Sequence, residues 1–244
     1  MAVLGIDIGG TGMKGALVDP NSGELLTERF RVPTPEKRDP KNMSKAVKKI
    51  VQHFDYHGKV GVGFPTVIKE NTCHSCGNLH ESWKNVNVSE LFKAETGLEF
   101  TVVNDADAAG FATMNFGVGK GEKGLVLMIT IGTGIGSGAF FNGELLPNFE
   151  LGQIPYKKYK KIEDWASNGA LEREGLGIEE WAARFNKFLK ITELLVAPQL
   201  FILGGGLSKR FAEYEHLINT KTPIRVAALK NNAGIVGAAA AALK

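Results

Sequence analysis

Residues 4–18, LGIDIGGTGMKGALV, constrain the fold more than any other stretch of the chain. Two mostly apolar runs flank a glycine-rich turn, and this pattern predicts a β-hairpin. The turn brings bare backbone amides and a hydroxyl next to Lys14, which suits phosphate, while the carboxylate of Asp7 suits Mg²⁺. The alternative is an ordinary hairpin whose glycines only supply positive φ. The position of Asp7 favours the phosphate- and Mg²⁺-binding turn over an ordinary hairpin, because an unpaired charge inside an apolar strand is costly.

Length and composition point to a globular protein with room for one large domain or two small ones. The chain has 244 residues, of which 43% are hydrophobic and 23% charged. Its net charge of +3 is too weak to argue for nucleic acid. No signal peptide precedes the hairpin, and no apolar run approaches the roughly 18 residues of a membrane helix. We therefore expect a cytoplasmic protein without a membrane partner.

Further motifs follow predicted strands. The strand at 100–104 delivers Asn104 and Asp105 to an Ala-rich helix at 106–116, and acids at strand ends face the ligand crevice of α/β proteins. The strand at 200–203 leads through Gly204, Gly205 and Gly206 into a helix, so their amides could meet a nucleotide. We also expect strands at 24–32 and 59–64, and helices at 42–54, 90–96, 179–195 and 233–243.

The opening hairpin has a second copy at 125–141, LVLMITIGTGIGSGAFF. Placing Ile131 on Ile8 puts Gly138 on Gly15, a shift of 123 residues. We infer a duplication with two α/β halves, each opening with a glycine hairpin that faces a shared cleft. Both turns lead into strands, which argues against a Rossmann domain. The predicted lobes are 1–107, with the C-terminal helix 230–244 packed back on it, and 108–229.

Five motifs in order resemble the ROK family of sugar kinases: DIGGT, NDADAAG, TIGTGIGSG, ELG and LGGGLS, which begin at residues 7, 104, 130, 150 and 203. The resemblance implies the two-lobed, ribonuclease H-like α/β fold of hexokinase, actin and Hsp70, with the active site in the cleft. The short length, ELG-x-IPY and EDWAS are most similar to the polyphosphate glucokinase branch. That branch phosphorylates glucose at the 6-hydroxyl from inorganic polyphosphate, ATP or both.

The resemblance also implies roles for individual residues. Asp105 would be the base that takes the proton of the sugar hydroxyl, although an acid there could equally cap the helix. Asp7 would organise Mg²⁺ or a water near the transferred phosphate. The predicted sugar-binding residues are Asn104, which offers a donor and an acceptor, with Asp105, Glu150, Gln153, Glu163 and Asn78. The predicted phosphate- or nucleotide-binding residues are Gly9, Gly10, Thr11, Lys14, Gly132, Thr133, Gly134, Gly204, Gly205 and Gly206. For Glu163 and Lys14 a merely solvated charge is the alternative.

Three departures from the family pattern bear on metals and donors. Most members have histidine where this chain has Gln153, a poor zinc ligand, so we expect no structural zinc there. The family's Cys-rich zinc loop is replaced by the basic run YKKYKK at 156–161. That run is either a solvated loop or part of a polyphosphate track with Lys120, Lys123 and Arg38. Cys73 and Cys76, with His80, have partial zinc spacing, and we favour a loop with chance cysteines.

Two other functions compete with a glucokinase. One is an ATP-dependent kinase of another hexose, such as mannose, fructose or an N-acetylhexosamine, which single residues do not exclude. The other is a sugar-responsive regulator of transcription. It is disfavoured because the hairpin begins at residue 4, which leaves no room for a helix-turn-helix module before it. The resemblance further implies a homodimer.

Overall fold

A computed structural model describes residues 2–76, 79–228 and 232–243 and divides the chain into two compact units. Unit 1 comprises Met1–Phe116 and Asn232–Lys244, and unit 2 comprises Gly117–Asn231. The predicted boundary at residue 107 is therefore placed too early. The physical reason is that α3 (Asp105–Phe116) is one unbroken helix that packs against the C-terminal helix of the same unit. Asn78 lies outside the described residues.

Unit 1 is built on a five-stranded sheet in the order β3-β2-β1-β4-β7. The predicted hairpin is present as β1 (Val3–Ile8) and β2 (Gly12–Val18), which pair antiparallel. The strands β4 (Val60–Phe64) and β7 (Phe100–Asn104) continue the sheet in parallel with β1. The strand β3 (Phe30–Pro33) is shorter than the predicted 24–32. The pairing of β2 with β3 starts only at Phe30. Before that point the Thr27 hydroxyl, rather than a backbone carbonyl of β3, accepts the amide of Leu17 in β2.

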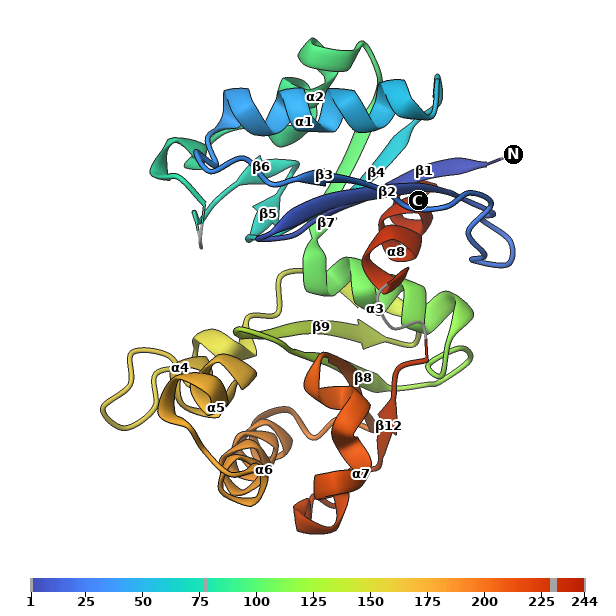
Figure 1. Cartoon of the computed structure of the whole chain (residues 1–244). Helices are drawn as coiled ribbons and strands as arrows, with labels where there is room; N and C mark the ends of the chain where they lie inside the picture. Colours follow the sequence, from blue (N-terminus) through green and yellow to red (C-terminus); the bar gives the residue numbers. More distant parts are fainter. Residues whose placement is uncertain (1, 77–78, 229–231, 244) are drawn as a thin grey trace. The chain divides into compact units, whose positions relative to one another are not determined.

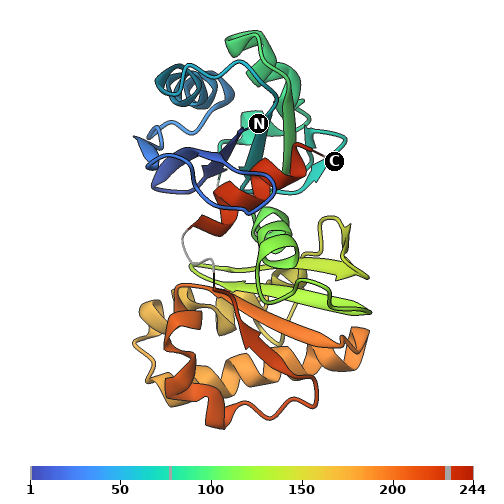
Figure 2. The same ribbon diagram turned by 90° about the vertical axis from the view of Figure 1, so that its right-hand side faces the viewer.

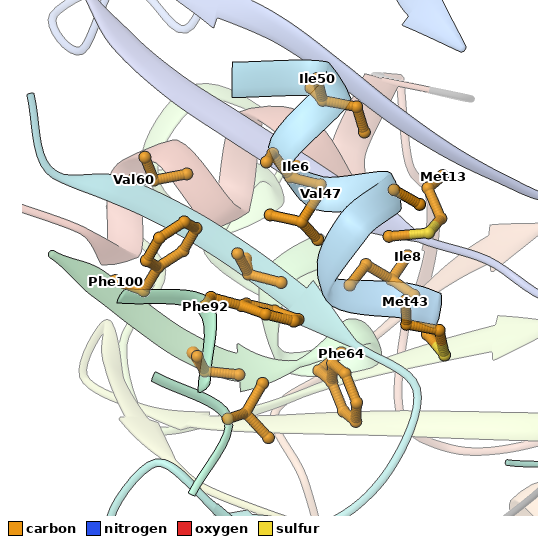
Figure 3. Packing of buried hydrophobic residues seen from close by; sticks show 14 of the residues in the cluster. Ile6, Ile8, Met13, Met43, Val47, Ile50, Val60, Phe64, Phe92 and Phe100 are labelled. Carbon is orange, nitrogen blue, oxygen red and sulfur yellow. The ribbon is translucent and has the colours of Figure 1, made fainter. Parts of the chain in front are cut away.

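Two helices cover one face of this sheet (Figures 1 and 3). They are α1 (Pro40–His53) and α2 (Val88–Thr96), and with the sheet they bury a continuous apolar core that includes Ile6, Val47 and Phe92. Each helix begins earlier than the sequence predicts. Asp39 caps α1 by accepting the amide of Asn42 at 2.8 Å, and Asn87 caps α2. Ser89, in the first turn of α2, donates its hydroxyl to the carbonyl of Phe100 at 2.7 Å.

The opposite face of the sheet carries α3 and α8 (Ala233–Ala241), as Figures 1 and 2 show. Small residues allow this close packing. A Cβ atom on Gly237 would overlap the backbone carbonyl of Ala108 in α3. The C-terminal helix α8 therefore belongs to unit 1, together with β1.

Unit 2 repeats the architecture with a sheet in the order β10-β9-β8-β11-β12. Its strands are β8 (Leu125–Ile131), β9 (Ile135–Phe141), β10 (Glu144–Leu146), β11 (Leu200–Gly205) and β12 (Ile224–Val226). The long helix α6 (Ile178–Val196) packs its aromatic side chains, among them Trp181 and Phe185, into one core with Leu127 and Ile129 of β8.

The two sheets support the inferred duplication strand by strand. Each has three antiparallel strands followed by two parallel ones, so β1 corresponds to β8 and β4 to β11. The residue alignment of the second strands, however, is wrong by one. Four residues separate the paired Ile8 and Met13, whereas only three separate Ile131 and Ile135. Ser137, which pairs with Ile129, is therefore the counterpart of Gly15, and Gly138 is not.

Short elements complete the chain. They are β5 (Ile68–Lys69), β6 (Thr72–Cys73), α4 (Glu163–Ala166), α5 (Asn168–Glu174), α7 (Phe211–Tyr214), and 3-10 helices at Glu81–Trp83, Leu151–Gln153, Leu207–Arg210 and Glu215–Leu217. Across the described ranges, none of the helices has the length and apolar character that crossing a bilayer requires.

Candidate active-site residues

Asp7 lies near the end of β1, opposite Lys14 of β2. Its carboxylate is pressed against Gly234 of α8, where a side chain would overlap it. Burial raises the pKa of Asp7 above its ordinary value, and the charge of Lys14 acts in the other direction. In the described part of the chain no group donates a hydrogen bond to this carboxylate. It is therefore a buried acceptor, and a carboxylate of this kind can bind a cation.

The turn after Asp7, which we call the phosphate turn (residues 9–12), is stabilised by hydrogen bonds that its backbone carbonyl groups accept. The amide of Gly9 donates to the carbonyl of Gly12 at 3.1 Å. Thr34 donates its hydroxyl to the carbonyl of Gly9 at 2.6 Å, and Arg31 donates to the carbonyl of Thr11 at 2.7 Å. Within the described ranges the amides of Gly10 and Thr11 have no acceptor, and a Cβ atom on Gly10 would point into open space. Free amides beside open space can bind an anion.

Asn104 and Asp105 stand where β7 meets α3. The side-chain oxygen of Asn104 accepts the amides of Ala106 at 2.8 Å and of Asp107 at 3.2 Å, so Asn104 caps α3. Its amide nitrogen donates to the carbonyl of Thr66 at 3.2 Å. In this structure the oxygen of Asn104 is occupied by two amides, whereas one N–H of its side chain stays available, and its role toward a sugar stays a prediction. Asp105 is exposed, and one of its oxygens accepts the amide of Ala106 at 2.9 Å.

Thr66 and Ser75, which no sequence motif indicates, hold the loop that supports Asn104. The Thr66 hydroxyl bonds to the carbonyl of Ser75 and lies 2.6 Å from its hydroxyl, while the Cys73 thiol donates to the same carbonyl at 3.0 Å. Burial raises the pKa of the Cys73 thiol to about 11. The Cys76 thiol instead donates to the carbonyl of Glu81 at 3.4 Å. No three histidine, cysteine or acidic side chains of the described residues gather as a metal site would require.

In unit 2, Glu163 is the centre of a polar cluster. One carboxylate oxygen accepts the amide of Ile135 at 3.0 Å. The other accepts the Gln153 side chain at 2.9 Å and Lys161 at 3.3 Å. The side chain is only 16% exposed. The Glu163 carboxylate is thus a largely buried hydrogen-bond acceptor and not a solvated charge on a helix surface.

Glu150 joins the same cluster. Burial raises the pKa of Glu150, and the neighbouring charge of Glu163 raises it further, while Lys161 opposes both. Two carboxylates and one amide side chain therefore share a small region beside the β8–β9 turn. Ser137 fixes the approach to Glu150, because its hydroxyl donates to the carbonyl of Phe149 and accepts the amide of Leu151 at 2.9 Å.

The turns of unit 2 that the sequence assigns to phosphate are also held by their carbonyls. In the turn at 132–134, Ser167 donates to the carbonyl of Thr133 at 2.9 Å, and the amide of Gly169 donates to the carbonyl of Gly132 at 3.3 Å. The turn after β11 leads, as expected, from strand to helix, but the helix is the short 3-10 element. Gly205 has a φ of +82°, which glycine adopts readily.

The basic run at 156–161 forms no uniform row of free cations. Lys161 is bonded to Glu163. The Lys157 ammonium lies 5.3 Å from the ring centre of Tyr156 and 5.5 Å from that of Trp165, and Lys158 lies 5.6 Å from that of Tyr159. Lys161 is thereby bound to the carboxylate cluster, although its place in the basic run makes it a candidate for a polyphosphate track.

A model of the ROK family matches residues 3–148. The chain belongs to the ROK family. Its curated relatives include the polyphosphate glucokinases of Mycobacterium tuberculosis, 38% identical over 98% of this chain and 91% of theirs, and of Mycobacterium leprae, 37% identical over 98% of this chain and 74% of theirs. Among solved structures, the inorganic polyphosphate/ATP-glucomannokinase of Arthrobacter sp. strain KM is 44% identical, covers 99% of this chain and 98% of its own, and superposes with a TM-score of 0.94.

A more distant ROK glucokinase from Streptomyces griseus, solved with glucose and AMPPNP, shares the fold at 24% identity, with a TM-score of 0.80 and coverage of 98% of both chains. Together these likenesses confirm the predicted fold class, the α/β fold of the ROK sugar kinases.

Proposed function

We propose that this ROK protein is a glucokinase that transfers a phosphoryl group from inorganic polyphosphate or ATP to the 6-hydroxyl of glucose. The observation that carries the proposal is the near full-length likeness to a relative named polyphosphate glucokinase, at 38% identity over 98% of the chain. The polar groups described above fit the chemistry that such a transfer requires.

On the sugar side, hydroxyl groups need acceptors, a donor and a base. Glu150 and Glu163 supply acceptors, and the remaining N–H of Asn104 supplies a donor. Asp105 is exposed at the first turn of α3, where the helix dipole favours the ionised carboxylate that a base must be. Gln153 gives its N–H to Glu163, which leaves its oxygen for a hydroxyl.

On the phosphate side, the free amides of Gly10 and Thr11 suit the oxygens of a phosphate, and Lys14 adds a positive charge. Gly132, Thr133 and Gly134 are proposed to contact phosphate, and Gly204, Gly205 and Gly206 the base of a nucleotide donor. The carboxylate of Asp7 fits Mg²⁺, because this ion takes one or two carboxylates and completes its coordination with water and substrate phosphates. When bound, Mg²⁺ would offset the negative charge on the transferred group.

Mannose is a second candidate substrate. The specific observation is that the relative of 44% identity is named a glucomannokinase. Mannose differs from glucose only in the configuration of the 2-hydroxyl, so the 6-hydroxyl and its proposed base Asp105 would be the same for both hexoses. The homodimer and the cytoplasmic location remain predictions from the sequence.

The function is tested by a matrix of acceptors and donors. Glucose, mannose and N-acetylmannosamine are each incubated with polyphosphate and with ATP, and the sugar phosphate is measured. We expect glucose 6-phosphate from both donors. Absence of transfer from polyphosphate would refute the donor assignment, and absence of any glucose 6-phosphate would refute the function.

The base is tested by Asp105→Asn, an isosteric change. We expect the turnover number to fall by about 10²–10⁴, the usual contribution of a general base. The thermal midpoint and glucose binding should stay near those of the unmodified chain, because the cap of α3 is Asn104. Near-normal turnover would contradict the assignment.

A further inference from the structure

Arg31 helps to hold the phosphate turn, but none of the substrate contacts proposed above involves it. The β-ladder places three charged residues directly opposite one another: Asp7 on β1 faces Lys14 on β2, and Lys14 faces Arg31 on β3. Residues paired in this way share one face of the sheet. A row of one acid and two cations therefore runs from the buried carboxylate to the edge strand.

The guanidinium of Arg31 is seated on the turn itself. Its terminal nitrogen donates to the carbonyl of Thr11 at 2.7 Å. A Cβ atom on Gly12 would overlap the guanidinium, so this group lies directly on the turn backbone. The cation is thus held within reach of whatever the amides of Gly10 and Thr11 bind.

The positive charge of Arg31 is not neutralised within the described ranges. No carboxylate there forms an ion pair with it, and the acid of the row, Asp7, is separated from it by Lys14. Arg31 is also exposed. A guanidinium carries five N–H groups, so several remain for a ligand after the bond to Thr11. Their planar fork matches two phosphate oxygens at once.

The ligand that fits is a chain of phosphates. The free amides of the turn suit one phosphate, and a linear polyphosphate carries further charge on each residue beyond it. We propose that Arg31 binds the phosphates of the polyphosphate donor next to the one held at the phosphate turn. This inference rests on the proposed function, and it names a donor contact outside the five family motifs.

A purely structural role is the competing explanation, since the bond to Thr11 also braces the turn. Two substitutions separate the roles. Arg31→Gln keeps an N–H donor for the Thr11 carbonyl but removes the charge, whereas Arg31→Lys keeps the charge but loses the fork. Arg29→Gln is the matched control. Arg29 has the same charge, precedes β3 by one residue, and has no bond to the turn among the described residues.

The experiment measures steady-state kinetics of the full chain with polyphosphate, ATP and glucose varied in turn. For Arg31→Gln we expect the KM for polyphosphate to rise about tenfold, or about 1.4 kcal/mol. The KM for ATP should rise less than about threefold, because a nucleotide keeps its base contacts, and Arg31→Lys should lie between. The KM for polyphosphate should also lose part of its salt dependence. Glucose KM, thermal midpoint and the Arg29→Gln control should stay within about twofold or a few degrees of the unmodified chain.

Three results would overturn the proposal: an unchanged KM for polyphosphate in Arg31→Gln, an equal rise in Arg29→Gln, or a parallel change in glucose KM and thermal midpoint. The second would mean general charge attraction, and the third a brace of the turn. A wild-type chain without glucose phosphorylation would instead refute the proposed function. An active wild-type chain with an unaffected Arg31→Gln variant refutes this inference alone.

Discussion

Replacing Glu163 with glutamine tests the carboxylate cluster of unit 2 most sharply. Both oxygens of Glu163 accept hydrogen bonds, one from the amide of Ile135 and the other from Gln153 and Lys161. A glutamine has only one acceptor oxygen. Whichever way its amide is turned, the NH₂ group must face an N–H donor.

The magnitude follows from these contacts. A hydrogen bond to a charged group contributes about 1.5–3 kcal/mol, and a shielded donor left without an acceptor costs about 1–3 kcal/mol. Since the side chain is 16% exposed, solvent replaces part of what is lost. We expect the free energy of unfolding to fall by about 2 kcal/mol. For a chain of this length that lowers the thermal midpoint by about 4–8 °C.

The same change should weaken glucose binding. The KM for glucose is expected to rise at least about tenfold, because a charged acceptor of the proposed sugar site is lost. A pH profile adds an independent test. The charge of Glu163 raises the pKa of Glu150. Its removal should move the acid-side loss of glucose affinity to lower pH.

Differential scanning fluorimetry and glucose kinetics between pH 4 and 8 provide the measurements, with Asp164→Asn as the control. Asp164 is the next residue of α4, and its carboxylate has no bond among the described residues. The control should change stability by less than about 0.5 kcal/mol. If both variants melted and bound glucose alike, the cluster would not act as described.

Two further substitutions test unit 1. Asp7→Asn should abolish turnover yet make the chain more stable at pH 7. Burial raises the pKa of Asp7 above 3.8, so the folded chain binds the proton of this carboxyl group more tightly than the unfolded chain does. The stability that the protonated group contributes below pH 3.8 is therefore lost as the pH rises. Denaturant unfolding at several pH values should show the advantage of the variant shrinking toward pH 4, and a variant less stable than wild type at pH 7 would contradict the argument. Gly237→Ala should destabilise the chain by about 1–3 kcal/mol or more, because the new methyl group overlaps the carbonyl of Ala108. Gly177→Ala is the control, because its methyl group would meet nothing within 4 Å. Gly177 is the N-cap of α6, where alanine is less favourable than glycine, so this change should cost no more than about 1 kcal/mol. An equal or smaller loss for Gly237→Ala would refute the close packing of α3 and α8.

Much of the fold was accessible from sequence because its signals are local. Apolar runs broken by glycine turns identified both hairpins, and the strands that end at Asn104 and Gly205 were placed within a residue or two of their observed ends. Boundaries that depend on a side chain from a neighbouring segment were less accurate. The caps Asp39 and Asn87 start α1 and α2 before the predicted residues 42 and 90, and the bond of Thr27 to Leu17 shortens β3.

The sequence by itself determined which chemistry the chain carries: the acids at strand ends, the glycine turns with their amides, and the order of the ROK motifs. These features lie within a few neighbouring residues, so composition and spacing disclose them. Only the tertiary structure decided which groups hold them in place. Arg31 reaches Thr11 because β3 pairs with β2, and Thr66 orients Asn104 across 38 residues of chain. Lys161 and Gln153 converge on Glu163 because the loop between them folds back. Such contacts depend on strand register and chain return, which no local pattern encodes.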